Sequence, residues 1–140
     1  MSTVSIEPEP LAETLARVSF AVIGQLSRVS AEEDMSLTQL RMLAILRDRH
    51  LRMAQLADAL GTDRSSTSGL INRAEQRGLV VRQPAADDKR GFTVSLSSEG
   101  HAFAARVQTR TRDALEPLLQ HLQPSDRDVL AALLTRCIET

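Results

Sequence analysis

The sequence predicts a mainly α-helical protein with one small β-hairpin, and three observations lead to this prediction. Apolar residues recur at helical spacing along most of the 140-residue chain. Two short runs rich in β-branched residues, 79–83 and 92–96, flank a charged loop and predict the hairpin. Gly61 and Gly78 each follow an apolar helical pattern, and a glycine commonly ends a helix.

The amino-terminal part of the chain predicts two helices. Residues 1–9 are rich in proline and glutamate and predict a disordered segment. An apolar stripe over 11–26 predicts a first helix of about five turns. A polar break follows, and Ser36 with Gln39 then forms a capping-box pattern that starts the second helix.

The next two helices are short and lead into the hairpin. A third helix is predicted at about 54–60, and a fourth at 64–77 begins after Asp63, a favourable capping residue. Pro84 is expected to end the first strand, and Gly91 to open the second. Helix, turn, helix and hairpin is the order of a winged helix-turn-helix, which places its second helix in the DNA major groove.

Two more helices follow the hairpin. Ser97 is expected to cap a long fifth helix, in which Pro117 predicts a kink or break near Ala114. Pro124 suits the first position of a sixth helix. Asp126 then lies in the first turn of that helix, near the positive end of its dipole.

Composition restricts the classes of function. The chain has no Trp or Tyr and three Phe, which argues against base stacking on single-stranded nucleic acid. Its one cysteine, Cys137, excludes an internal disulfide and lies on the apolar stripe of the last helix, so we expect a core thiol. No apolar run approaches the roughly 20 residues of a membrane span and no secretory pattern is visible, so the sequence predicts a cytoplasmic protein with no membrane partner. No cofactor and no metal site are predicted.

Charge is unevenly distributed, although the net charge is −1. Residues 41–90 carry ten Lys and Arg against six acids, whereas residues 1–40 carry two against six. The positive excess therefore coincides with the predicted helix-turn-helix and hairpin. The local field, rather than the net charge, attracts a polyanion such as DNA.

The fourth helix has one face suited to DNA. Its apolar face is expected to pack inward, and the opposite face is small, polar and basic. Asn and Gln can contact adenine, Arg can contact guanine or phosphate, and the free amides of Ser65 and Ser66 can bind phosphate. The alternative is an ordinary solvated helix, which the basic hairpin that follows argues against. The predicted DNA-contacting residues on this helix are Arg64, Ser65, Ser66, Ser68, Gly69, Asn72, Arg73 and Gln76.

The hairpin tip, residues 87–90, is charged. Lys89 and Arg90 lie where a wing reaches the minor groove, whose negative potential attracts arginine. The two acids before them would repel phosphates. At least one of these carboxylates is therefore expected to be neutralised within the protein, by Arg73 or Arg77. The alternative is a solvated charged turn.

Together these patterns resemble the MarR family of bacterial regulators over about residues 11–138. The family's D-x-R wing signature is matched by Asp88-Lys89-Arg90, and its "L-(S/T)-x-x-Q" and "L-A-x-x-L-G" patterns appear at 35–39 and 56–61. The residues that match the pattern around the signature are Arg77, Gly78, Leu79, Val80, Pro84, Val94, Leu96, Ser97 and Gly100.

The resemblance implies a homodimer that binds a pseudo-palindromic operator in double-stranded DNA, most often as a repressor. It implies one domain over 10–140, in which 36–100 form the DNA-binding lobe and 10–32 with 98–140 form the dimerisation helices. A dimer is also favoured by the apolar stripes of the terminal helices, which exceed what one lobe can cover.

The family pattern assigns roles in the wing and also shows departures. Arg90 enters the minor groove, and Asp88 fixes the wing through an arginine, for which Arg77 is the candidate. Gly69 stands where the family often has a large basic residue. A glycine within a helix costs about 1 kcal/mol relative to alanine, so Gly69 is either tolerated or allows closer approach to the bases. Thr67, more polar than usual, suggests looser packing of the fourth helix.

Many family members release DNA when a small phenolic or lipophilic acid binds, which implies a ligand cleft where the first and fifth helices meet the second. Such a ligand needs apolar walls and a cation at the rim. Arg17 could instead be a solvated helix charge, and His50 a surface residue. The residues predicted for this site are Arg17, Phe20, Met42, His50 and Arg52.

Two other classes of function remain. A winged helix that serves only protein–protein contacts predicts no basic focus on the recognition helix and wing, and the observed charge argues against it. An enzyme is the least favoured class, because the three histidines lack metal-binding spacing and no nucleophile motif is present.

Overall fold

The computed structural model describes residues 9–139, except for the side chains of Asp88 and Lys89. Within this range the chain forms six helices and a three-stranded antiparallel sheet of order β1-β3-β2. The elements are α1 (Leu11–Glu32), α2 (Leu37–Leu46), β1 (Leu51–Arg52), α3 (Met53–Leu60), α4 (Arg64–Gln76), β2 (Val80–Ala85), β3 (Asp88–Leu96), α5 (Ser98–Leu119) and α6 (Pro124–Ile138). The segment 1–8, predicted to be disordered, lies outside the described residues.

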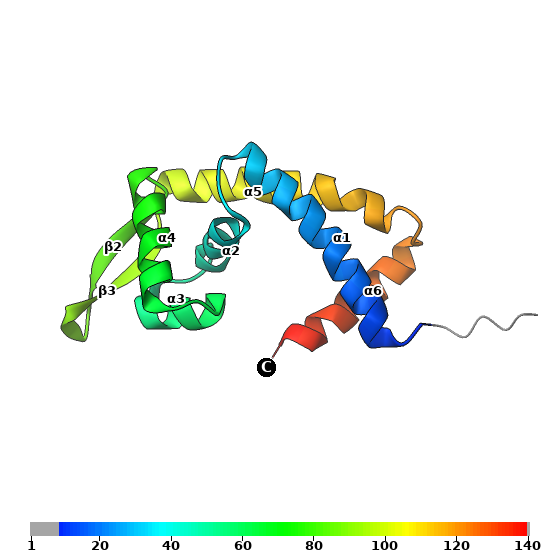
Figure 1. The fold of residues 1–140 in the computed structure, drawn as a ribbon, viewed down its shortest axis with the longest axis horizontal. Coiled ribbons are helices and arrows are strands. Elements are labelled where there is room, and N and C mark those ends of the chain that lie inside the picture. Colours follow the sequence, from blue (N-terminus) through cyan, green and yellow to red (C-terminus); the bar gives the residue numbers. More distant parts are fainter. Residues whose placement is uncertain (1–8, 140) are drawn as a thin grey trace, which may run out of the picture.

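The chain has the outline of an arch (Figure 1). Helix α5 runs along the top, with a compact lobe of α2, α3, α4 and the hairpin at one end and an arm of α1 and α6 at the other. None of the helices in the described range is long and apolar enough to cross a bilayer.

Local signals in the sequence account for most helix boundaries. Ser36 Oγ accepts from the backbone N–H of Gln39 at 3.1 Å, and Gln39 Oε1 accepts from that of Ser36 at 3.4 Å, which confirms the capping box. Gly61 ends α3 with a φ of 66°, a left-handed conformation that glycine adopts without strain. Ser97 Oγ caps α5 by accepting from the N–H of Gly100 at 2.9 Å.

The hairpin is longer than predicted, and the prediction that Pro84 ends its strand is wrong. Strand β2 continues to Ala85, with Pro84 opposite Phe92 and a register shift between Pro84 and Ala85. Since β2 is an edge strand, a proline can be accommodated there without breaking a ladder hydrogen bond. The short β1 was not predicted; Leu51 lies opposite Val94.

Pro117 predicted a kink or a break in α5 near Ala114, and the break does not occur. The helix continues to Leu119 with Pro117 inside it. Proline lacks one backbone N–H, so the bond to the carbonyl of Asp113 is lost, but this lies in the last two turns, where few further helix bonds depend on it.

The hydrophobic core lies in the lobe. Met42, Leu46, Leu56, Ile71 and Val94 are almost completely buried there. The arm has almost no core of its own, because α1 buries only two residues and α6 buries none. The large apolar side chains left exposed on the arm and on the adjoining end of α5 are Leu11, Leu15, Val18, Phe20, Ile23, Leu118, Val129, Leu133, Leu134 and Ile138.

Cys137 belongs to this exposed surface. In the single chain Cys137 is exposed on α6, so this chain alone does not bury the predicted core thiol, and its burial at an interface between two arms stays a prediction. The apolar stripe was identified correctly. The structure shows, however, that no other part of the described chain buries it.

Candidate nucleic-acid interface and ligand cleft

Helix α4 turns its predicted DNA-contacting face outward. Its buried residues are Thr67, Leu70, Ile71 and Ala74, as predicted. Thr67 packs firmly despite its hydroxyl, which lies 2.8 Å from Thr62 Oγ1 and donates to the carbonyl of Asp63 at 2.8 Å. The opposite face, from Ser65 to Gln76, is left to solvent or is half-buried.

The start of α4 differs in one respect from the prediction. Asp63 Oδ1 accepts from the backbone N–H of Ser66 at 2.7 Å, so this amide is not free to bind a phosphate. The same bond, followed by a hydrogen bond from the Ser66 side chain, holds the pKa of Asp63 below its ordinary value. The carboxylate is therefore ionised at neutral pH and occupies the amino end of the helix.

Gly69 leaves room on α4 that Arg73 fills. A methyl group at Gly69 would meet only the Arg73 guanidinium, with Nη1 at 3.5 Å. An incoming base edge would thus meet the Arg73 side chain over Gly69. The glycine is sterically replaceable by alanine, which favours the interpretation that it is tolerated.

The wing is held by an arginine that was not predicted for this role. Arg52, at the end of β1, forms an ion pair with Asp87 in the turn between β2 and β3. One tip carboxylate is thus neutralised within the protein, as expected, but Asp87 is paired with Arg52 rather than with Arg73 or Arg77. Arg90 is exposed on β3, and the predicted roles of Asp88 and Lys89 fall on side chains outside the described part of the structure.

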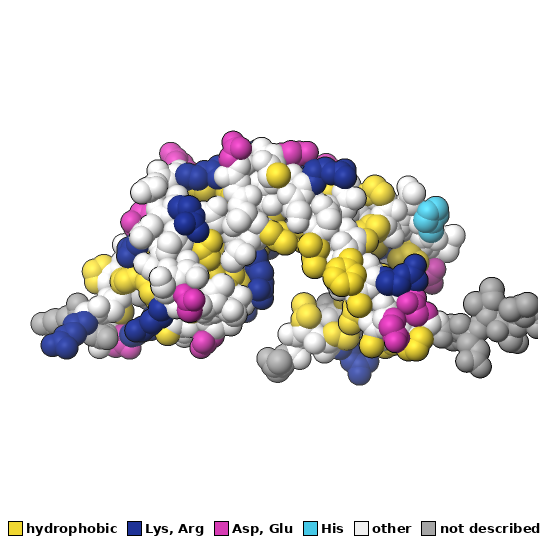
Figure 2. All heavy atoms as spheres, viewed as in Figure 1, with side chains coloured by type: hydrophobic (Ala, Val, Ile, Leu, Met, Phe, Trp, Pro, Cys, Tyr) yellow, Lys and Arg dark blue, Asp and Glu magenta, His cyan; other side chains and the backbone are white. Residues whose placement is uncertain are grey.

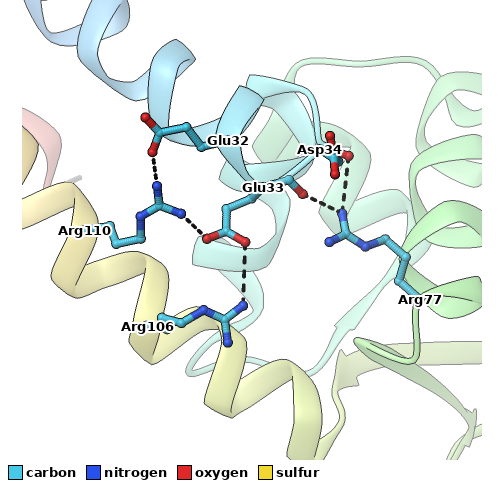
Figure 3. Close-up of polar contacts among 6 residues, drawn as sticks. All are labelled: Glu32, Glu33, Asp34, Arg77, Arg106 and Arg110. Atoms are coloured by element: carbon cyan, nitrogen blue, oxygen red, sulfur yellow. Dashed lines mark hydrogen bonds and ion pairs between the residues drawn. The ribbon is translucent and has the colours of Figure 1, made fainter.

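Arg77 instead joins the recognition helix to the arm (Figure 3). It follows the last residue of α4 and donates to the backbone carbonyls of Glu33 at 3.1 Å and Asp34 at 3.4 Å. The corner between α1 and α2 presents these carbonyls, since Asp34 adopts a φ of 55° after α1 ends. The guanidinium also lies 5.5 Å from the ring centroid of Phe103 on α5.

The same corner is bound to α5 by two arginines (Figure 3). Arg110 pairs with both Glu32 and Glu33, and Arg106 lies 3.6 Å from Glu33. The Glu33 side chain is 12% exposed, so its charge is less screened than that of a surface pair. The end of α1, the middle of α5 and the end of α4 are thus linked by one polar cluster.

Another arginine that was not predicted, Arg82, contacts the exposed face of α4. Arg82 on β2 donates to Asn72 Oδ1, and its Nε donates to Glu75 Oε2 at 3.1 Å. Strand periodicity places Arg82 on one face of the hairpin, but it does not reveal which helix that face meets.

A cleft of about 420 Å³ lies where α1, α2 and α5 meet, the place that the resemblance implies. Apolar side chains gather along the hollow beneath the arch (Figure 2). Two arginines are at the cleft: Arg41 donates to the carbonyls that end α3, whereas Arg47 is paired only loosely with its neighbour Asp48, at 3.7 Å. The apolar lining consists of Ile23, Leu26, Leu37, Leu40, Leu43, Ala44, Phe103, Ala104 and Val107.

None of the five residues predicted for the ligand site lines this cleft. Arg17 pairs with Glu9 at 2.6 Å on the exposed surface of α1, and Phe20 is 73% exposed. Met42 is fully buried in the lobe, His50 lies in a separate shallow hollow, and Arg52 belongs to the wing. The position of the cleft was predicted from the resemblance, but its residues were not.

Comparison with known proteins agrees with this architecture. A model of the MarR family matches residues 33–91. The chain is 29% identical to the HTH-type transcriptional regulator PecS of Dickeya dadantii, over 95% of this chain and 82% of that protein.

Two solved structures resemble the whole chain. Wild-type MarR from E. coli superposes with a TM-score of 0.81 at 23% identity, covering 95% of this chain and 99% of that one. BpsR of Bordetella bronchiseptica, in a structure that concerns regulation of its DNA binding by 6-hydroxynicotinic acid, gives 0.73 at 19% identity, covering 100% and 99%. The likeness of fold therefore includes the arm as well as the lobe.

Proposed function

Because this chain belongs to the MarR family of transcriptional regulators, we propose that it is a homodimeric repressor that binds a pseudo-palindromic operator and is released by a small lipophilic or phenolic acid. The relatives are transcriptional regulators rather than enzymes, and MarR itself is named a repressor. One observation carries the proposal: α4 exposes small, polar and basic side chains beside a wing that carries Arg90.

DNA binding follows from the two exposed elements. The small residues Ser65, Ser68 and Gly69 allow α4 to enter the major groove, where Arg73 and Asn72 reach base edges or phosphates. The hairpin then extends along the backbone and inserts Arg90 into the adjacent minor groove. A second chain related by two-fold symmetry would read the other half-site about one helical turn away.

Replacing Arg90 by Ala should weaken operator binding by about 10-fold to 100-fold, since a buried minor-groove contact is lost. The fold should survive, because Arg90 is exposed on the wing. Fluorescence anisotropy on a DNA fragment from upstream of the protein's own gene measures the affinity. An unchanged affinity in the folded variant would contradict the role of the wing.

The same titration at several salt concentrations distinguishes a DNA-binding regulator from a winged helix that serves only protein–protein contacts. A protein that neutralises at least six phosphates should lose about a thousandfold in affinity between about 50 and 200 mM salt. A flat salt dependence would favour the protein-interaction module instead.

Release is proposed to start in the cleft of α1, α2 and α5. An acid bound there would place its ring against Phe103 and its carboxylate at Arg47. Phe103 lies directly beneath Arg77, which joins the end of α4 to the corner of α1. A ligand that displaces Phe103 would therefore alter the position of α4 relative to the arm, and hence the spacing of the two recognition helices. The coupling free energy of such effects is typically about 1–3 kcal/mol.

Arg47→Ala should raise the concentration of salicylate or hydroxynicotinate needed for half-release of DNA by about 10-fold, because a charge-assisted contact contributes about 1.5–3 kcal/mol. Arg17→Ala is the matched control, since Arg17 lies outside the cleft and pairs with Glu9. If both variants released DNA at the same acid concentration, Arg47 would not belong to the ligand site. If only Arg17→Ala required more acid, the ligand site predicted from the sequence, which contains Arg17, would be supported instead.

A further inference from the structure

Asn72, on the exposed face of the recognition helix, is held by an arginine from the wing strand. Arg82 donates through Nη2 to Asn72 Oδ1 and through Nε to Glu75 Oε2 at 3.1 Å. Its guanidinium also lies over the ring of Phe92, 4.8 Å from the centroid. The Arg82 side chain is 30% exposed, so three neighbours from α4 and β3 fix its position at the edge of the proposed DNA-binding face.

This contact determines which way the Asn72 amide faces. A guanidinium carries only hydrogen-bond donors, so the amide atom turned toward Arg82 must be the oxygen. The amide nitrogen then points away from Arg82, on an exposed side chain. Asn72 therefore presents its amide donors outward, while its oxygen is turned toward Arg82.

The orientation selects between purines. Adenine offers the major groove one acceptor, N7, and one donor group, the N6 amine, whereas guanine offers two acceptors, N7 and O6. An asparagine that recognises adenine uses its oxygen for the N6 amine. Here Arg82 holds that oxygen turned toward the wing strand, which leaves it poorly placed for the N6 amine of an incoming base. The two acceptors of guanine match the outward amine of Asn72 better.

We propose, on the basis of the proposed DNA-binding function, that Arg82 is a specificity-determining residue that acts through Asn72 and makes this position of the recognition helix select guanine over adenine. The sequence alone led to the opposite expectation, because an unrestrained asparagine pairs best with adenine. Arg82 need not touch DNA for this effect; it positions the amide that does.

The inference is tested by a scan of single-base changes through one operator half-site, with affinities measured for wild type and Asn72→Ala. The base that Asn72 contacts is identified as the operator position at which the base preference of wild type disappears in Asn72→Ala. We expect wild type to favour guanine over adenine there by about 10-fold. Preference for adenine at that position, or identical scans for the two proteins, would overturn the inference while leaving DNA binding intact.

Arg82→Met tests the positioning role directly. It retains the apolar stem over Phe92 and removes every donor, so the Asn72 amide is released. The guanine preference should fall to less than about 2-fold or change to adenine, whereas affinity for non-specific DNA changes little. Arg112→Met, in the second half of α5, removes the same charge away from this cluster and should keep the wild-type preference.

Asn72→Asp gives a second variant that does not disturb Arg82, because a carboxylate accepts from the guanidinium equally well. It presents no donor to the base and should lose the guanine preference. Retention of that preference in Arg82→Met or Asn72→Asp would refute the inference. If wild type bound no duplex of any sequence, the proposed function would fail as well, and the scan distinguishes these outcomes.

Discussion

Leu133→Asp is expected to convert the protein to a monomer and to lower operator affinity by about 100-fold or more. Leu133 lies on α6, a 15-residue helix that buries none of its residues within the described chain. A helix of this length is marginal in water without tertiary packing, and in the proposed dimer a second copy would cover its apolar surface. A carboxylate in that interface would be desolvated without a partner, which costs several kcal/mol.

The loss of affinity follows from the loss of bivalency. Two linked half-site contacts bind about 10²–10⁴ times more tightly than one, even when each contact is unchanged. Light scattering at micromolar concentration measures the association state, and anisotropy measures DNA binding. Thr135→Asp introduces the same charge about half a turn of the helix away from the stripe and should remain dimeric. A dimeric Leu133→Asp protein with normal affinity would refute the arm as the interface.

Gly100→Ala is expected to destabilise the protein by about 3 kcal/mol or more, a large fraction of a typical domain's stability. Gly100 lies in the first turn of α5, directly against the backbone where the chain enters β2. A methyl group there would overlap the carbonyl oxygen of Leu79 and approach its carbonyl carbon to 2.9 Å. The overlap is with backbone, so no side-chain rotation can relieve it.

Relief would require α5 and the hairpin to separate. That movement would disturb the bond from the Ser97 N–H to the Leu79 carbonyl, at 3.0 Å, and the bond from Ser97 Oγ to the Gly78 carbonyl, at 2.5 Å. Gly24→Ala is the control, because a methyl at that exposed place in α1 meets nothing within 4 Å. It should raise stability by up to about 1 kcal/mol through helix propensity. Urea unfolding measures both variants, and equal stabilities would show that α5 and the hairpin are not packed as described.

The features that the sequence predicted correctly are those with local causes. The Ser36 and Asp63 caps, the glycine at 61 and the buried face of α4 depend on residues within about one turn of one another. The apolar stripe of α6 was also recognised, and the structure leaves it exposed in the single chain. The errors at Pro84 and Pro117 have the same cause. A missing proline N–H disturbs a structure little when the proline lies at a sheet edge or near a helix end, and the sequence does not show that it lies there.

The sequence by itself determined the fold class, the recognition helix and the face of that helix that meets solvent. Only the tertiary structure decided the partners of the long side chains: Arg52 with Asp87, 35 positions away, and Arg77 with the Glu33 carbonyl, 44 positions away. It also assigned Arg47 to the cleft and Arg82 to Asn72. The physical reason is that helical periodicity depends on residues close together in the sequence. A flexible arginine, in contrast, binds whichever acceptor the packing of distant elements places near it.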